Sequence, residues 1–207
     1  MQRLILVRHA ESDYSARGLV SGDPRIAVGL TDIGREQARL LGEALAGERI
    51  DLCVTSEFAR TIETAGVAFA GRDIPRLVVP ELNDHTAGEY EGRPFAEYLA
   101  WAHTAGPLDV IPGTEETRAS IASRLARGYA SLLERAERTI VAVLHSLPIA
   151  YLVAAAGGSD PARRLPMFAY AEPHELDRAQ VEAGVARLAR WSKRPKWVNH
   201  LGESPNG

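Results

Sequence analysis

The feature that most constrains the fold is a regular alternation of short apolar runs with longer amphipathic stretches. The runs are rich in β-branched residues and span 4–7 (LILV), 50–56 (IDLCVTS), 75–79 (PRLVV) and 138–145 (RTIVAVLH). Buried runs of this length, separated by helical patterns, are typical of strands in a sheet whose crossover connections are helices. The sequence therefore predicts an α/β fold.

The segments between these runs carry helix start and stop signals. We expect one helix to follow an N-cap at Thr31 and to end at Gly47. Two other helices are predicted to start at Ser56 and at Thr114, which two glutamates follow. A further helix is predicted to start at Ser146; it contains Pro148 in its first turn and ends at Gly157 and Gly158.

The C-terminal part of the chain is less regular. Residues 175–191 fit either an amphipathic helix or two short strands broken at Gly184. We expect a single domain over residues 1–191, followed by a tail, residues 192–207, that frays.

Composition argues against several classes of protein. The chain has 207 residues, 45% of them apolar, which is enough for one substantial core. A formal net charge of −3 and a pI near 6.1 provide no positive field to hold nucleic acid or an anionic membrane. The basic stretch at residues 191–197 (WSKRPKW) is therefore interpreted as an ordinary amphipathic terminus.

The single cysteine and the N-terminal run bear on location. Cys53 has no partner for an intramolecular disulfide, and we expect it to lie in the core. The run at residues 4–7 is too short for the apolar core of a signal peptide or for a membrane span of about 20 residues. We expect a cytoplasmic protein whose oligomeric state the sequence leaves open, with a homodimer as one alternative.

Polar side chains follow three of the four apolar runs. Arg8 and His9 come directly after the first, Arg60 falls in the first turn of the helix after the second, and His145 ends the last. Taken singly, each of these residues also fits a solvated or structural role. The carboxyl ends of parallel strands meet at one edge of a sheet, guanidinium groups match phosphate oxygens, and imidazole can act as a nucleophile. Their convergence predicts a site for a phosphoryl group.

The same residues lie in motifs that resemble those of the histidine phosphatase superfamily, which includes the cofactor-dependent phosphoglycerate mutases. The matches follow in the family's order over residues 4 to about 158: LVRHAES, GLTDIGREQARLLGEAL, TSEFARTIETA, LNDHTAGEYEG, PGTEE and VAVLHSLPI. The resemblance implies a three-layer α/β/α sandwich with a mostly parallel central sheet, like that of the mutases.

The resemblance also implies roles for the converging residues. Family members form a phosphohistidine, which places the nucleophile on His9, with Arg8 and Arg60 binding the phosphoryl oxygens and His145 completing the pocket. An imidazole with an ordinary pKa of about 6.5 is largely unprotonated at neutral pH, and the two arginines discourage its protonation further. We expect a protonated His145 to help stabilise the transition state, and we expect neither a metal nor a cofactor.

The proton donor for the leaving group is less direct to assign. The family acid is a glutamate four residues before a glycine, and alignment on Gly88 puts Asp84 there, with Glu81 as the alternative. We choose Asp84, and we expect a phosphate dianion in a closed pocket to raise the pKa of its carboxyl.

Several positions depart from the family pattern or lack a motif. Ala10 replaces a glycine, which makes a positive φ angle unfavourable there, Ser15 replaces an asparagine, and Ser146 follows His145 where glycine is usual. Arg17 and Arg25 lie in a loop that contacts phosphate or substrate in relatives, so we regard them as binding candidates beside Ser15, Glu81 and Ser146. The remaining histidines are interpreted as structural, with His85 as the first exception to consider: His85, His103, His174 and His200.

The segment 89–112, which covers the site in relatives, is compact here, and this favours a phosphatase over a mutase. The predicted activity is hydrolysis of phosphate monoesters of small metabolites through phospho-His9. The alternatives are phosphoryl transfer of the mutase type and a catalytically weak phospholigand-binding regulatory protein.

Overall fold

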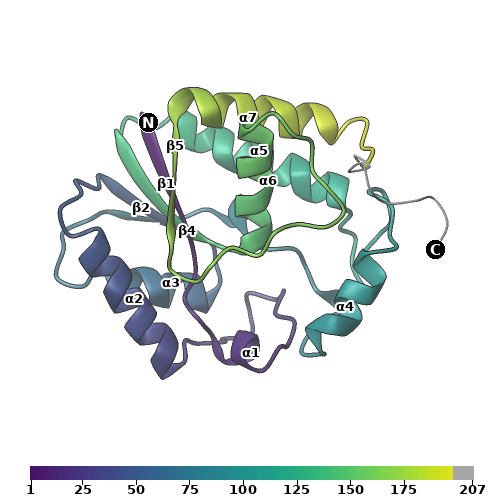
Figure 1. Cartoon of the computed structure of the whole chain (residues 1–207), viewed down its shortest axis with the longest axis horizontal. Helices are drawn as coiled ribbons and strands as arrows, with labels where there is room; N and C mark the ends of the chain where they lie inside the picture. The colour runs from purple at the N-terminus through teal and green to yellow at the C-terminus, as the bar shows by residue number, and fades with distance from the viewer. Residues whose placement is uncertain (198–207) are drawn as a thin grey trace.

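A computed structural model describes residues 1–197 and contains one five-stranded sheet (Figure 1). The strands are β1 (Arg3–Arg8), β2 (Leu52–Thr55), β3 (Arg76–Val78), β4 (Thr139–Leu144) and β5 (Pro173–Asp177), in the order β3-β2-β4-β1-β5. The pairings of β1 with β4, β4 with β2 and β2 with β3 are parallel, and β5 runs antiparallel to β1 at one edge. The predicted mostly parallel α/β sheet is confirmed.

Helices cover both faces of the sheet, which completes the expected three-layer sandwich (Figure 1). On one face lie α2 (Asp32–Ala44) and α3 (Ala59–Ala68), and on the other α5 (Arg118–Leu133), α6 (Ser146–Ala156) and α7 (Arg178–Trp191). Alternate residues of β1 serve the two layers: Ile5 packs with α2 and α3, whereas Leu4 and Leu6 pack with the other three helices. The central strands are consequently rigid supports for whatever follows their carboxyl ends.

Short elements surround that carboxyl edge. These are α1 (Asp13–Ala16), the 3₁₀ turns Pro80–Leu82 and Gly88–Tyr90, and α4 (Phe95–Ala102). Figure 1 shows α1 and α4 below the ends of the central strands, on the side away from the N-terminus.

The helix starts were predicted with mixed success. Thr31 caps α2 as expected, since its hydroxyl accepts a hydrogen bond from the Gly34 amide at 3.0 Å. The prediction for α5 is wrong, because Thr117, not Thr114, occupies the N-cap and shares a capping box with Ser120. Thr114 instead lies in a tight turn, where its hydroxyl donates to the Ile111 carbonyl at 2.8 Å.

Two further serine starts are displaced for reasons that concern the site. The helix α3 begins only at Ala59, because Ser56 is fully buried and directs its hydroxyl to the His145 ring. In α6 the N-cap position belongs to His145, and Ser146 is the first helical residue. Gly157 ends this helix as predicted.

For residues 175–191 the helix alternative is confirmed from residue 178 onward, and the alternative of two strands broken at Gly184 is wrong. They contain the end of β5 and then all of α7, which starts after an Asp177 N-cap and runs through Gly184. The adjoining stretch 192–197 packs against the domain, contrary to the expectation that it frays. The Trp197 ring lies 5.5 Å from that of Trp191, and its indole N–H donates to the Ala105 carbonyl at 3.0 Å. The rest of the predicted tail lies outside the described residues.

Two smaller predictions concern single features. Cys53 is buried in β2, where burial raises the pKa of its thiol to about 11. Within residues 1–197, none of the helices combines the length and apolar character needed to cross a membrane.

Candidate active site

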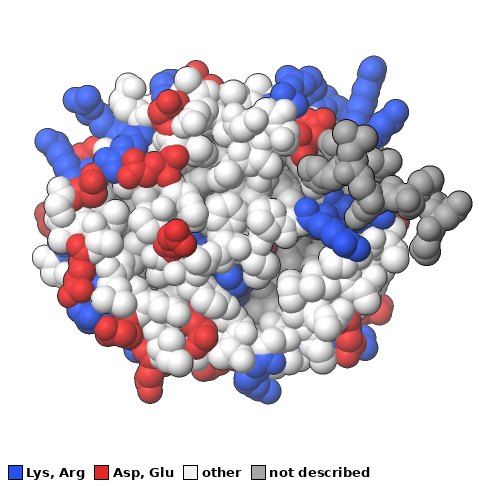
Figure 2. Space-filling model, in the orientation of Figure 1, with Lys and Arg blue, Asp and Glu red and all other residues white. Residues whose placement is uncertain are grey.

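The four residues that sequence motifs bring to one edge are adjacent in the structure. Arg8 ends β1 and His9 follows it, Arg60 lies in the first turn of α3, and His145 joins β4 to α6. All four are at least nine-tenths buried, with the two histidines 5% and 0% exposed. Arg8, His9 and Arg60 line a cavity of about 310 Å³. Figure 2 shows this face of the molecule hollowed near its centre, with blue atoms of lysine or arginine visible in the hollow.

The ring of His9 is held in one orientation. Its Nδ1 lies 2.7 Å from the Ala10 carbonyl oxygen, which can only accept, so Nδ1 carries the hydrogen and Nε2 keeps its lone pair. Burial lowers the pKa of His9 well below 6.5, and the charges of Arg60 and Arg8 lower it further. Ala10 is itself fully buried and has a negative φ angle, so its methyl is accommodated without strain. The site thus presents an unprotonated imidazole nitrogen to the cavity.

Arg60 is the centre of the hydrogen-bond network. Its Nε donates to His9 Nε2 at 3.1 Å, its Nη1 to the Ser21 hydroxyl at 2.8 Å, and its Nη2 lies 3.0 Å from His145 Nδ1. Burial lowers the pKa of Arg60 to about 10, which still leaves it charged at neutral pH. One guanidinium therefore contacts both imidazoles.

His145 differs from the expectation of a protonated group. Its Nδ1 accepts from Arg60, and its Nε2 lies 2.8 Å from the Ser56 hydroxyl, so the neutral tautomer carries its hydrogen on Nε2. Burial lowers the pKa of His145 well below 6.5, Arg60 lowers it further, and the Asp84 carboxylate only partly offsets them. In the ligand-free protein His145 is neutral.

Asp84 faces the same network from the loop after the first 3₁₀ turn. Its Oδ2 lies 3.7 Å from both Arg60 Nη2 and His145 Nδ1, and its Oδ1 accepts from the His85 amide at 3.1 Å. Burial raises the pKa of Asp84, but the neighbouring imidazoles and the Arg60 charge outweigh burial, so the pKa lies below its usual value. This direction in the ligand-free site is opposite to the one expected for a site that holds a phosphate dianion.

The loop that carries Asp84 is fixed from behind by Arg124 of α5. Its guanidinium donates to the carbonyl oxygens of Glu81, Asn83 and Asp84 at 2.8–3.1 Å and pairs with Glu116 at 2.8 Å. Glu81 contributes this carbonyl, but its side chain is exposed and does not line the cavity.

Arg8 is positioned by the loop that precedes β5. Its Nη1 donates to the Phe168 carbonyl at 2.6 Å, and its guanidinium carbon lies 3.9 Å above the centre of the Tyr170 ring. The Tyr170 ring is also 6.0 Å from that of His9. Sequence reasoning missed Tyr170, because no motif extends to this loop.

The other candidate binding residues separate into two groups. Ser15 and Ser146 line the cavity: Ser15 forms a capping box with Ser12, and the Ser146 hydroxyl accepts from the Phe168 amide at 3.2 Å. Arg17 and Arg25 are exposed and do not line it, and Arg25 pairs with Asp23 at 2.7 Å.

Two of the remaining histidines and parts of the segment 89–112 also line the cavity. His85, the exception that the sequence singled out, lines the cavity, and so does His103, which was interpreted as structural. His174 packs its ring 4.7 Å from that of Phe168, and His200 lies outside the described residues. Within the segment 89–112, α4 supplies one wall, and residues 163–167 of the α6–β5 loop also line the cavity. The arginine, tyrosine and phenylalanine lining residues that the sequence motifs do not reach are Phe95, Tyr98, Arg118, Arg163, Arg164 and Tyr170.

Within residues 1–197, no group of three or more histidine, cysteine, aspartate or glutamate side chains is arranged to hold a metal ion.

Comparison with known proteins identifies relatives with this architecture. The chain is 32% identical over 161 residues to an adenosylcobalamin/alpha-ribazole phosphatase of Escherichia coli K12, covering 73% of this chain and 77% of that protein. It is 42% identical over 128 residues to a 2,3-bisphosphoglycerate-dependent phosphoglycerate mutase of Mycobacterium leprae, covering 54% and 51%. The crystal structure of the alpha-ribazole phosphatase from Shigella flexneri is similar with a TM-score of 0.73 and 28% identity, covering 84% of this chain and 90% of that one.

A family model covers nearly the whole described chain. Residues 4–194 match the model of the histidine phosphatase superfamily, branch 1. The chain belongs to the histidine phosphatase superfamily.

Proposed function

We propose that this enzyme hydrolyses phosphate monoesters of small metabolites through a phosphohistidine on His9. The observation that carries the proposal is the buried imidazole of His9, whose unprotonated Nε2 lies 3.1 Å from the Arg60 guanidinium and beside Arg8. A phosphoryl group that enters this space meets a nucleophile and two cationic hydrogen-bond donors together.

In the first step His9 Nε2 attacks phosphorus while the bond from phosphorus to the ester oxygen breaks. Arg8, Arg60 and the first amides of α6 bind the equatorial oxygens, where charge spreads in the transition state. The Arg60 hydrogen bond to His9 is then replaced by one to a phosphoryl oxygen. Removal of one such donor typically costs a factor of about 10²–10³ in rate.

Asp84 supplies the proton that the leaving alkoxide needs. The negative charge of a bound dianion raises the pKa of Asp84, because it opposes the neighbouring His145, His85 and Arg60 groups that lower this pKa. The carboxyl then donates its proton to the ester oxygen. In the second step the carboxylate takes a proton from water, the hydroxide oxygen bonds to phosphorus, the bond from phosphorus to Nε2 breaks, and inorganic phosphate leaves.

The relatives support hydrolysis over transfer. The phosphatase alignment covers 77% of its protein, whereas the mutase alignment covers 51%. Mutase-type transfer stays as the second candidate because that shorter alignment has the higher identity, 42% against 32%.

Two assays test the proposal. Wild type and His9→Ala are compared on 4-nitrophenyl phosphate and a panel of alkyl phosphates, and rapid acid-free quenching with mass spectrometry looks for one added phosphoryl group on His9. Turnover and the adduct in the wild type alone are expected. Ligand binding without any turnover would instead support a regulatory protein. Following 3-phosphoglycerate with and without 2,3-bisphosphoglycerate separates the enzymatic alternatives, because a phosphatase releases phosphate and a mutase forms the isomer.

The setting of the enzyme is part of the proposal. We propose a cytoplasmic enzyme that acts without a metal ion or nucleic acid; its single cysteine, buried in β2, is compatible with a reducing compartment. Full activity after exhaustive dialysis against a chelator is expected. Sedimentation of the purified enzyme tests whether it forms a homodimer.

A further inference from the structure

One end of the cavity carries buried polar groups that the proposed reaction does not use. His85 Nε2, Tyr98 OH and Arg118 Nη1 have no hydrogen-bond partner within residues 1–197, and their residues are 7%, 3% and 7% exposed. All three residues line the cavity, as does Arg163, whose Nε is also unpartnered. Buried polar atoms are normally satisfied, so several unpartnered ones along one cavity indicate a place for a polar ligand group.

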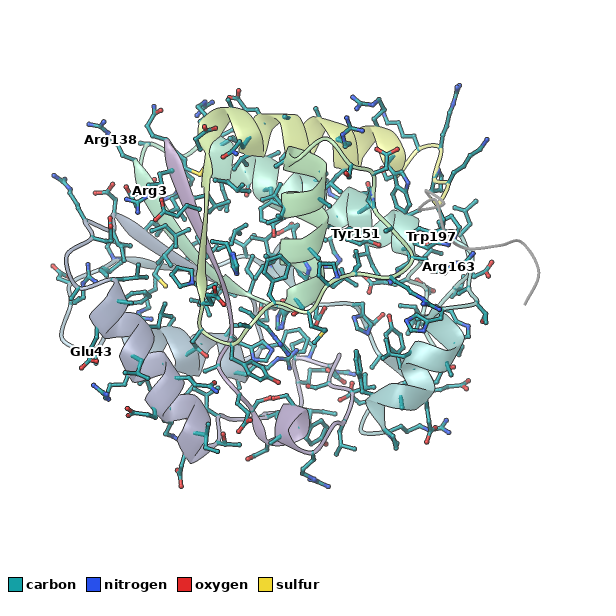
Figure 3. All side chains as sticks on the ribbon, in the orientation of Figure 1. Arg3, Glu43, Arg138, Tyr151, Arg163 and Trp197 are labelled. Atoms are coloured by element: carbon teal, nitrogen blue, oxygen red, sulfur yellow. The ribbon has the colours of Figure 1, made fainter. Side chains whose placement is uncertain are left out.

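These groups come from α4, the start of α5 and the loops beside them, and not from the strand end that carries His9. His85 follows Asp84, and its ring stacks on that of Tyr98 with centroids 4.5 Å apart and planes 16° apart. Arg118 starts α5 and donates from Nη2 to the Arg163 carbonyl at 3.2 Å. Figure 3 shows Arg163 close to α4, near the labelled Trp197. We call Tyr98, Arg118 and Arg163 the distal subsite.

Arg118 is the informative member of the distal subsite. Its guanidinium carbon lies 5.9 Å from the ring centres of both Tyr151 and Trp197, which restrict its position. No carboxylate among the described residues lies within 4 Å of it, although buried guanidinium groups are ordinarily paired with acids. The Arg118 guanidinium is thus buried beside the cavity, restricted by two aromatic rings and without a carboxylate partner. Such a group is suited to bind an anionic group of a ligand.

The charge of the whole cavity supports this assignment. Besides Arg8 and Arg60, its lining contains Arg118 and Arg163, but only one carboxylate, Asp84. A single phosphoryl group at His9 engages Arg8 and Arg60. The excess of cations at the other end is matched by a ligand with a second negative group.

A further part of the cavity wall is apolar. It is formed by side chains from α4, the start of α6 and the α6–β5 loop: Phe95, Leu99, Ala102, Leu147, Leu165 and Met167. An apolar wall excludes a strongly hydrated linker and accepts a hydrocarbon or aromatic one.

We propose that the substrates are phosphate monoesters whose alcohol has an apolar or aromatic body and an anionic group at its far end. This inference rests on the proposed function, because it assumes that the phosphoryl group occupies the His9 end. Arg118 binds the second anion through a charge-assisted hydrogen bond, and the Tyr98 hydroxyl donates another. The distal subsite binds the second anion equally in the substrate complex and in the transition state. Its contacts therefore lower KM and leave kcat nearly unchanged.

A matched pair of substrates tests the charge. 4-Carboxyphenyl phosphate and 4-carbamoylphenyl phosphate have the same ring and nearly the same size, but only the first carries the second anion. We expect the wild type to have a kcat/KM about 10- to 100-fold higher for the carboxylate, mostly through KM. 1,4-Phenylene bisphosphate distinguishes a carboxylate from a phosphate as the preferred anion.

Variants locate the preference. Arg118→Gln should bring the ratio of the two kcat/KM values close to 1, and Tyr98→Phe, which removes only the unpartnered hydroxyl, should lower the ratio several-fold. Arg127→Gln is the matched control, since Arg127 lies on the same helix and bonds to Ser123 outside this cavity. The control should retain the wild-type ratio.

The outcomes separate the two proposals. If the wild type hydrolyses neither these esters nor 4-nitrophenyl phosphate and the alkyl phosphates, the proposed function fails; if it hydrolyses only the latter, the distal subsite is overturned. If it hydrolyses both with equal kcat/KM, and 4-hydroxybenzoate inhibits no better than 4-hydroxybenzamide, the distal subsite is overturned while the phosphatase stands. The inhibition measurement uses only wild-type enzyme, so the test holds even if Arg118→Gln does not fold.

Discussion

Asp84→Asn is the substitution that most directly tests the proposed roles of the Asp84 carboxyl as proton donor and as base. Asparagine keeps the size of the side chain but has no carboxyl proton to donate and no negative charge. Asp84 lies 3.7 Å from both Arg60 and His145, so the amide still fits among them. The variant therefore changes acid–base chemistry without opening a cavity.

The expected loss depends on the leaving group. General acid catalysis typically contributes a factor of about 10²–10⁴, and an alkyl phosphate needs all of it because a free alkoxide is a poor leaving group. A 4-nitrophenolate leaves without a proton, so its departure should slow by less than about tenfold. The dephosphorylation step loses its base for either substrate, because both pass through the same phospho-His9.

The assay is a stopped-flow comparison of both esters at saturating substrate. With 4-nitrophenyl phosphate, Asp84→Asn should release a burst of nitrophenol close to the enzyme concentration and then turn over slowly, while an alkyl phosphate shows no burst. An equal loss of the first step for both esters would refute the acid role of Asp84. A corresponding loss in Glu81→Gln would move that role to Glu81, whose side chain lies outside the cavity lining.

Four further predictions concern ionisation and stability. Nitrogen-detected NMR of the ligand-free protein should show neutral rings for His9, protonated on Nδ1, and His145, protonated on Nε2, down to well below pH 6.5; a midpoint at or above 6.5 for either ring would contradict the network. Because both pKa values are lower than in the unfolded chain, urea denaturation should show stability falling as pH drops below about 6.5, and a rise there would reverse the sign. Thr117→Ala should cost about 1 kcal/mol of unfolding free energy through the lost cap of α5, and an unchanged urea midpoint would exclude that cap. Gly88→Ala should cost at least about 2 kcal/mol, since Gly88 has a φ of 55° and a Cβ there would lie 2.1 Å from the Pro112 carbonyl oxygen; an unchanged melting temperature would contradict this.

The parts of the site that local sequence could predict are those tied to strand ends. Arg8 and His9 directly follow β1, and His145 follows the neighbouring strand β4. In a parallel sheet these positions must meet, so spacing in the chain becomes proximity in space. Arg60 joins them because its helix starts immediately after β2.

The parts that could not be predicted depend on contacts between distant segments. Arg118 is separated by 45 residues from Arg163, whose carbonyl it binds, and nothing in either local sequence indicates the other. The edge strand β5 (PHELD) has only Leu176 buried and no β-branched residue, so it lacks the usual strand pattern. Thr114 resembles an N-cap, but a bridge between Val110 and Thr117 closes a turn there and delays the helix.

The ionisation states of the empty site explain how a carboxylate with a lowered pKa can act as an acid. Arg8 and Arg60 are cationic, Asp84 is anionic and both histidines are neutral, so these groups together carry one positive charge. A phosphate dianion overcompensates this charge, so these five groups and the dianion together carry one negative charge. A proton is then favoured on Asp84, because protonation restores neutrality where charge is poorly solvated. The substrate therefore brings about the protonation of the acid that later assists departure of its own alcohol.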